Sequence, residues 1–191
     1  MSHEPTGEVR VERLDPARPE AFFRLHCAGN GAGWCRCVAW WVPTWEGWGE
    51  RSEAENRRLR EDLFARGERD LWVCFVDDVP AASVQACPRD RLEKLRAQFD
   101  LTPDPGAWAI GCFFVAPAFR RQGLARRLLG AVLDELRELG ARSVEAFPRQ
   151  GADLDPGEQW TGPAALYAAM GFQPAQEAGR RAVVRLALSP E

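Results

Sequence analysis

The residues most suggestive of chemistry form a short basic turn in front of an apolar helix, in the stretch FRRQGLARRLL at positions 119–129. Helices usually begin with Ser, Thr, Asp or Asn and often carry acids in the first turn, whereas this one begins beside Arg120 and Arg121. A helix N-terminus is already electropositive, so added arginines are expected where an anion binds. Gly123 lets the backbone approach such an anion closely. The pattern predicts a cradle for phosphate oxygens, with Arg126 as a further cation.

The turn matches neither of two common nucleotide-binding motifs. It contains no G-x-x-x-x-G-K-S/T and no G-x-G-x-x-G, which argues against a P-loop and against a dinucleotide site. Because short motifs also arise by chance, the alternative is a solvated helix start that happens to be basic.

A second cluster of reactive and aromatic side chains lies near the front of the chain, in GWCRCVAWWVPTWEGW, residues 33–48. Prolines and glycines interrupt this stretch, so no long helix is expected. Its aromatic side chains predict a wall that receives an apolar or cationic substrate, with Trp41 and Trp45 as candidates. The alternative is that the tryptophans cover the core beneath irregular chain.

Cys35 and Cys37 are spaced so that an extended chain would point both thiols to the same side. A structural zinc site needs four ligands and no second pair matches, so no metal is expected. The two thiols are expected to line the substrate pocket or to be buried and inert. A metal-sensing or redox-sensing protein that uses them is a rival interpretation. The chain has six cysteines and no export signal, which indicates reduced thiols.

The length of 191 residues indicates one domain over 1–191, with residues 1–7 as a loose tail. The chain has no apolar run of about 18 residues and no apolar signal segment, so neither a membrane contact nor export is expected and the location is expected to be cytoplasmic. The net charge of -3 argues against nucleic-acid binding. Lys94 is the only lysine among 25 basic residues.

Hydrophobic periodicity and turn residues predict a mixed α/β sheet of about seven strands flanked by helices. Ser52 followed by Glu55 is a capping-box signal for a helix over 51–67. The apolar strand over 106–117, the basic turn and the helix that ends at Gly140 form a βαβ unit with the following strand. Further helices are expected over 18–27, 88–99 and 162–171, and further strands over 8–14, 70–76, 80–87, 142–147 and on both sides of Ala178-Gly179.

The order of these motifs resembles the GNAT superfamily of acyl-CoA-dependent N-acetyltransferases. Arg120-x-x-Gly123-x-Ala125 fits the pattern Q/R-x-x-G-x-G/A after a strand that ends in Val115-x-Pro117, and Tyr167-Ala-Ala-Met-Gly171-Phe172 follows about forty residues later. The resemblance covers residues 107–187 and implies the GNAT fold. The C-x-C-x-x-W element at residues 35–40 is similar to that of a bacterial subgroup whose substrates are mostly unassigned.

The resemblance implies acetyl-CoA as cosubstrate. Its pyrophosphate would lie on the amides of the basic turn, and its pantetheine arm would pair with the apolar strand. The implied cofactor-binding residues are Phe113, Phe114, Val115, Arg120, Arg121, Gln122, Gly123, Leu124, Ala125 and Arg126.

The resemblance also implies catalytic residues. Tyr167, the only tyrosine, stands where these enzymes place a phenol near the CoA sulfur, and it can protonate the departing thiolate. The alternative is a core aromatic whose hydroxyl is bonded to the backbone. The apolar strand lacks the acid that many members carry there, and Glu145 on the next strand is the substitute. Glu145 would take the proton of the amine or hold its ammonium form, or else it forms an ion pair with an arginine.

The expected activity is transfer of an acetyl group to the primary amine of a small molecule or peptide by direct attack in a ternary complex. Acids of the loop GADLDPGEQW, residues 151–160, would attract a cationic amine or remain solvated. A covalent route through Cys112 is less expected, because His3 and His26 lie far from the central motifs in sequence. The resemblance also makes a homodimer an expectation. The rival is an acyl-CoA-binding sensor or scaffold without catalysis.

Overall fold

The computed structural model describes residues 7–27, 33–151, 154–155, 157–178 and 181–188. Within these ranges the chain forms a seven-stranded sheet in the order β1-β2-β3-β4-β5-β7-β6. Neighbouring strands are antiparallel except β4 and β5, which are parallel. The expected mixed sheet is confirmed. The strands are β1 (Val9–Arg13), β2 (Leu71–Val76), β3 (Val79–Pro88), β4 (Ala107–Val115), β5 (Ser143–Ala146), β6 (Gln173–Ala178) and β7 (Arg181–Ala187).

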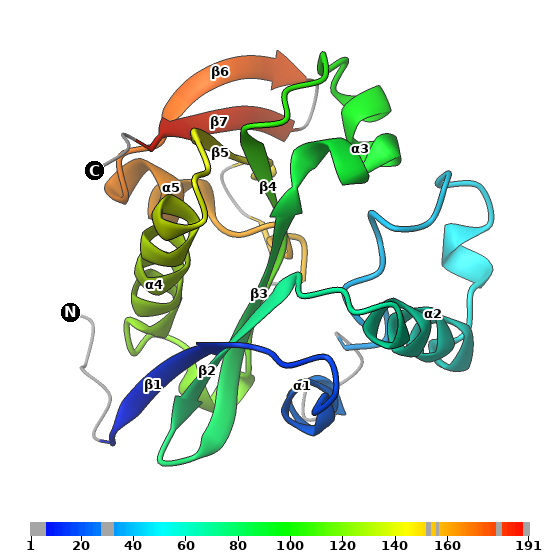
Figure 1. Ribbon diagram of the computed structural model, residues 1–191, viewed down its shortest axis with the longest axis vertical. Helices are drawn as coiled ribbons and strands as arrows, with labels where there is room; N and C mark the ends of the chain where they lie inside the picture. Colours follow the sequence, from blue (N-terminus) through cyan, green and yellow to red (C-terminus); the bar gives the residue numbers. More distant parts are fainter. Residues whose placement is uncertain (1–6, 28–32, 152–153, 156, 179–180, 189–191) are drawn as a thin grey trace.

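Helices cover both faces of the sheet, as Figure 1 shows. α4 and α5 pack on one face, and α1, α2 and α3 lie on the other side. The α-helices are α1 (Glu20–Cys27), α2 (Glu53–Ala65), α3 (Glu93–Gln98), α4 (Leu124–Glu138) and α5 (Ala164–Ala169). None of the helices in the described ranges is both long and apolar enough to span a membrane.

Local signals explain several of these boundaries. Ser52 Oγ accepts the amide hydrogen bond of Glu55, whose carboxylate accepts from the Ser52 amide, so the predicted capping box begins α2. The β2–β3 hairpin turns at Asp77 and Asp78, with φ of 47° and 62°. Two successive left-handed residues make a turn whose twist matches that of the paired strands.

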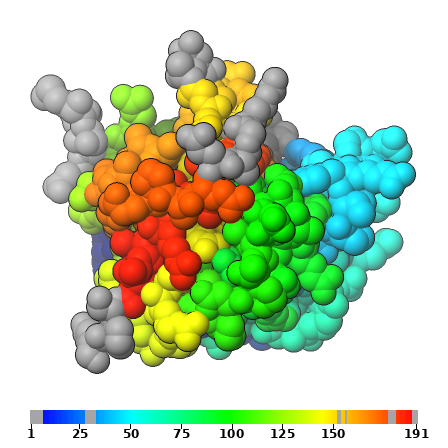
Figure 2. All heavy atoms as spheres, turned by 90° about the horizontal axis from the view of Figure 1, so that it is seen from above, coloured from blue at the N-terminus to red at the C-terminus, as the bar shows by residue number. Residues whose placement is uncertain are grey.

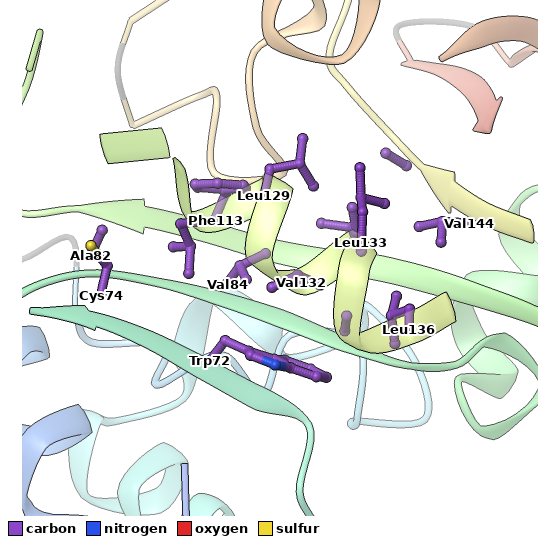
Figure 3. Close-up of a cluster of buried hydrophobic side chains, with 14 of the residues drawn as sticks. Trp72, Cys74, Ala82, Val84, Phe113, Leu129, Val132, Leu133, Leu136 and Val144 are labelled. Atoms are coloured by element: carbon purple, nitrogen blue, oxygen red, sulfur yellow. The ribbon is translucent and has the colours of Figure 1, made fainter. Parts of the chain in front are cut away.

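The main core lies between α4 and the sheet (Figure 3). α4 carries apolar residues three and four apart, and such spacing places them on one face of a helix. Side chains of α4 that point toward the sheet are Leu129, Val132, Leu133 and Leu136, and the strands present Trp72, Val84, Phe113 and Val144.

On the opposite face, a buried ion pair fixes the irregular segment that precedes α2. Arg60 of α2 has no exposed surface, and its Nη1 lies 2.8 Å from Asp70 Oδ1. Its Nη2 donates to the carbonyl of Cys37 at 2.7 Å, and its Nε donates to the carbonyl of Arg36 at 3.2 Å. Both carbonyls belong to a turn outside any strand, so Arg60 replaces the partners that a sheet would supply.

Asp70 extends this network to two more side chains. Its Oδ2 accepts from Gln85 Nε2 at 2.7 Å and from Trp41 Nε1 at 3.1 Å. The carboxylate therefore joins the segment over 33–48 to the central sheet.

The β6–β7 hairpin, orange to red in Figure 2, lies beside the green segment that contains α3. Gln176 Nε2 donates to the carbonyl of Phe99 at 3.0 Å and ties the two together. This contact places β6 beside the end of α3.

The buried pair should dominate the stability of the α2 region. Arg60→Met leaves Asp70 without a counterion in the interior and is expected to cost about 3–5 kcal/mol of unfolding free energy. Arg57→Met on the same helix is the control. It removes an exposed ion pair with Glu61 and a contact with the Phe23 ring, and about 0.5–1 kcal/mol is expected. Urea unfolding measures both values, and equal losses would contradict the role given to Arg60.

Candidate active site

The basic turn lies between a short 3-10 helix, Pro117–Phe119, and α4. Gly123 is the N-cap of α4 with φ of 74°, and no side chain caps the first amides. Arg121 also has a positive φ, 65°, which is uncommon outside glycine and occurs often at ligand sites. A Cβ built on Gly123 would meet no atom within 4 Å. The turn therefore offers open, uncapped amides between exposed guanidinium groups.

The strand that leads into this turn is bent by a β-bulge at Gly111. The pairing of β4 with β3 shifts register at this point, and a bulge bends the strand that carries the extra residue. A Cβ on Gly111 would lie 2.7 Å from Gln85 Oε1 and 2.9 Å from Trp40 Cδ1. Trp40 Nε1 also donates to the Gly111 carbonyl at 2.8 Å. The ring of Trp40 therefore holds the bulge from the face that α3 covers.

Beyond the bulge, β4 and β5 stop pairing. Their parallel register ends at Ile110 and Ala146. Past that point the amide of Phe113 donates to the carbonyl of Trp160 at 2.6 Å. The edge of β4 that is expected to pair with pantetheine is thus partly occupied by the segment around Trp160.

A cavity of about 1170 Å³ connects the turn, the end of β4 and the tryptophan-rich segment. Six of the ten residues expected to bind the cofactor line it: Phe113, Phe114, Val115, Arg120, Arg121 and Ala125. The other four do not: Gln122, Gly123, Leu124 and Arg126. Leu124 points into the core and is 1% exposed, so only its amide is available to a ligand.

Tryptophans form one wall of the cavity. Trp45 lines it as expected, together with Trp34, Trp48 and Trp160. The ring of Trp48 lies 5.0 Å from that of Trp34 and 6.0 Å from that of Trp45. Sequence reasoning missed Trp160, because it belongs to a polar loop without hydrophobic periodicity.

The predicted wall residue Trp41 lies elsewhere. Its Nε1 is bonded to Asp70 and its ring packs against the cluster that contains Leu92 and Phe99. Trp41 does not line the cavity, so its role is to anchor the wall segment.

The chain's own lysine occupies the face of the tryptophan wall. Lys94 Nζ lies 3.5 Å from the ring centre of Trp45 and 5.5 Å from that of Trp48. Burial lowers the pKa of Lys94 to about 8, and Arg51 adds to the shift. Lys94 does not line the cavity, so this cation stands behind the wall that was expected to receive an apolar or cationic acceptor.

The expectation that Cys35 and Cys37 point the same way is wrong. Arg36 and Cys37 have φ of 47° and 53°, so the chain turns here and is not extended. Cys35 lines the cavity, and burial raises the pKa of its thiol to about 12. Cys37 instead turns inward, with its Sγ 3.1 Å from Cys112 Sγ. No group of three or more His, Cys, Asp or Glu in the described ranges is arranged to hold a metal ion.

His26 lines the cavity although its position in the sequence did not mark it. Its ring stacks on Phe114 at 4.9 Å, and its Nε2 lies 3.5 Å from Ser83 Oγ. The Nδ1 atom is buried and has no hydrogen-bond partner. Only the folding of α1 across β3 and β4 brings this imidazole to the site, so no local pattern could have revealed it.

Tyr167 lies close to the cavity but does not line it. Its hydroxyl donates to the carbonyl of Thr161 at 2.6 Å. A Cβ built on Gly162 would lie 2.3 Å from the hydroxyl oxygen of Tyr167. Burial raises the pKa of the Tyr167 phenol, and Cys112 adds to the shift. The hydroxyl is therefore protonated at neutral pH and covered by the segment that carries Trp160.

The structure does not bring Glu145 to the cavity. Both of its carboxylate oxygens lie 2.9 Å from Nη1 of Arg89, which is itself buried. Arg185 Nη1 is 3.8 Å from Glu145 Oε1. Glu145 therefore forms the ion pair with an arginine that was the alternative to a catalytic role. This arrangement argues against a role of Glu145 in proton transfer at the cavity.

Of the acidic loop over 151–160, Asp153 lies outside the described residues. Glu158 forms an ion pair with Arg149 at 2.8 Å, and the backbone amide of Asp155 donates to Glu158 at 3.1 Å. Neither acid lines the cavity, whereas Arg181 does.

Comparison with known proteins agrees with this geometry. Residues 34–172 match the sequence profile of the family described as the acetyltransferase (GNAT) family. No curated protein sequence matches the chain.

Solved structures show the same fold. A Desulfovibrio desulfuricans protein assigned to the GNAT family of acetyltransferases superposes with a TM-score of 0.61 at 18% identity, over 95% of this chain and 100% of that one. A GNAT-family acetyltransferase from Listeria monocytogenes 4b F2365 gives 0.60 at 14% identity, over 94% and 95%. The PaiA N-acetyltransferase of Thermoplasma acidophilum, in complex with coenzyme A, gives 0.53 at 9% identity, over 95% and 99%.

The profile match spans well over half of the chain, and it includes the bulged strand, the basic turn and α4. The chain therefore belongs to the GNAT family of acetyltransferases.

Proposed function

We propose that this protein transfers the acetyl group of acetyl-CoA to the primary amine of a small molecule or peptide by direct attack in a ternary complex. The observation that carries the proposal is the single cavity that joins the basic turn to the tryptophan wall. Its volume of about 1170 Å³ exceeds the range of about 300–1,000 Å³ usual for one small ligand. Two substrates can therefore lie in it together. The C-x-C-x-x-W element supports placing the protein in the bacterial subgroup that shares it.

The basic turn fits the diphosphate of CoA. The uncapped amides of Leu124 and Ala125 face an open space beside Gly123, and Arg120 and Arg121 line the adjoining cavity. Amides at a helix start bind phosphate oxygens, and arginine adds planar donors. The thioester would supply an activated carbonyl group at the other end of the pantetheine arm.

The reaction needs an amine that has lost its proton. The nitrogen attacks the acetyl carbonyl, the new C–N bond forms, the C–S bond breaks, and the amine proton leaves as the thiolate gains one. His26 carries the imidazole among the described lining side chains and is the proposed acceptor of the amine proton. Its Nε2 lies 3.5 Å from Ser83 Oγ and 3.6 Å from Cys37 Sγ, and its ring stacks on Phe114, so the imidazole is held at the edge of the cavity.

Tyr167 is the proposed donor to the thiolate. Burial raises the pKa of the phenol, so the hydroxyl is protonated when the thiolate forms, although it gives up its proton less readily than a free phenol. Donation requires the hydroxyl to turn from the Thr161 carbonyl toward the sulfur. The single hydrogen bond that holds it is the contact this movement breaks.

The turn can be tested by calorimetric titration with acetyl-CoA. Gly123→Glu places a carboxylate where phosphate is expected and should abolish saturable one-to-one binding. Gly140→Glu at the other end of α4 is the matched control, because Gly140 also has a positive φ, 76°, and an open Cβ position. Both variants carry similar backbone strain of about 1–2 kcal/mol. Loss of binding in both, or in neither, would contradict the assignment of the turn.

The role of Tyr167 can be separated from its packing. Tyr167→Phe should lower kcat about 10²-fold, as for other general acids, with an unchanged acetyl-CoA affinity. It should also cost about 1 kcal/mol of stability from the lost buried hydrogen bond. Steady-state kinetics with an acceptor found by an amine screen measures the first effect. A less stable variant with full kcat would show that Tyr167 only supports the segment around Thr161.

A further inference from the structure

The charged side chains that line the cavity are positive, whereas a polyamine or another cationic acceptor would require negative ones. The basic side chains in the described lining are His26, Arg120, Arg121 and Arg181, and no carboxylate is among the described lining residues. Arg120 and Arg121 belong to the phosphate turn. Arg181 begins β7, on the β5 side of the gap between β4 and β5, and is left for another anion.

Two hydrogen bonds and an aromatic ring hold the side chain of Arg181 in place. Its Nη1 donates to the carbonyl of Phe147 at 3.1 Å and to Thr161 Oγ1 at 3.0 Å. Its guanidinium lies 5.0 Å from the ring centre of Trp160. No described carboxylate pairs with it, and the neighbouring acid Glu158 is bound to Arg149. A partly buried cation that lacks a partner is costly, and an anion in the cavity would offset that cost.

Burial lowers the pKa of Arg181, and the nearby Arg149 adds to the shift. The guanidinium nevertheless remains charged at neutral pH, because arginine starts from a pKa above 12. Two acceptors and one ring set the orientation of Arg181. No described residue is bonded to its Nε or Nη2, and the proposed ligand would bind these atoms.

The tryptophan wall argues in the same direction. Lys94 does not line the cavity, but its Nζ lies 3.5 Å from the ring centre of Trp45 and 5.5 Å from that of Trp48. Its charge therefore stands behind the wall and opposes a second cation in front of the same rings. Together with Arg181 in the lining, this positive charge favours the neutral form of a bound amine, which is the form that attacks.

We infer that the acceptor is an amine that also carries a carboxylate, as an α-amino acid with an apolar or aromatic side chain does. The carboxylate would bind Arg181, and the apolar part would lie against Trp160 and Trp45. This inference rests on the proposed function, because the same cavity must hold the acyl donor. A polyamine or an internal lysine of a peptide brings no carboxylate beside its amine and does not complete the site.

Binding of the reaction product tests the inference without turnover. N-acetylphenylalanine and N-acetylphenethylamine differ only in the carboxylate, and calorimetry compares them on protein saturated with CoA. The acid should bind the wild type about tenfold to a hundredfold more tightly, as expected for a hydrogen-bonded charge. Arg181→Gln should remove this difference in affinity, because it removes the positive charge that binds the carboxylate. The glutamine amide can still donate to the Phe147 carbonyl, so the local structure should be kept. Arg185→Gln, which removes an exposed arginine of the same strand that does not line the cavity, should preserve it.

The outcomes separate this inference from the proposed function. Equal binding of the two compounds, preference for the neutral one, or binding of neither by protein that binds acetyl-CoA would overturn the carboxylate inference alone. Turnover gives a second reading, in which phenylalanine should exceed phenethylamine and spermidine in kcat/KM. Faster acetylation of spermidine would contradict the inference while confirming acetyl transfer. Failure to bind acetyl-CoA would instead remove the proposed function itself.

Discussion

The buried ion pair between Arg60 and Asp70 is the interaction on which the tryptophan-lined half of the cavity depends. The segment over 33–48 forms no strand, so its carbonyl groups need partners that a sheet does not provide. Arg60 supplies them, and Asp70 balances its charge while bonding to the sheet through Gln85. An interior ion pair of this kind is expensive unless all its hydrogen bonds are made. Here the hydrogen bonds that Arg60 and Asp70 make to the segment over 33–48 also position the tryptophan wall.

The same segment is attached to the strand that forms the other side of the cavity. Trp40 bonds to the carbonyl of the bulge residue Gly111, and Cys37 contacts Cys112 on the next position of β4. The C-x-C-x-x-W element therefore has a structural role, because its second cysteine and its tryptophan both contact β4. Its first cysteine is the one that faces the cavity. The shape of the wall and the bend of β4 are thus set together.

Features that depend on neighbours in sequence could be predicted, and those that depend on distant partners could not. The capping box at Ser52, the turn at Asp77 and the repeating leucines of α4 are local, and each lies where the pattern indicated. The divergence of Cys35 from Cys37 arises from left-handed backbone at two non-glycine residues, for which composition gives no signal. The ion pair of Glu145 and the exposure of His26 to the cavity arise from helices and turns far away in the chain.

At the proposed acetyl-CoA site, the preference for arginine over lysine has a chemical consequence. A lysine amine in such a place is itself an acyl acceptor, whereas a guanidinium stays protonated and is a poor nucleophile. The described cavity lining supplies its positive charge from arginines, and the single lysine of the chain lies against Trp45 instead of projecting into the cavity. The described lining thus suits the proposed anionic acyl donor, because its cations are strong and it includes no lysine amine that the donor could acylate.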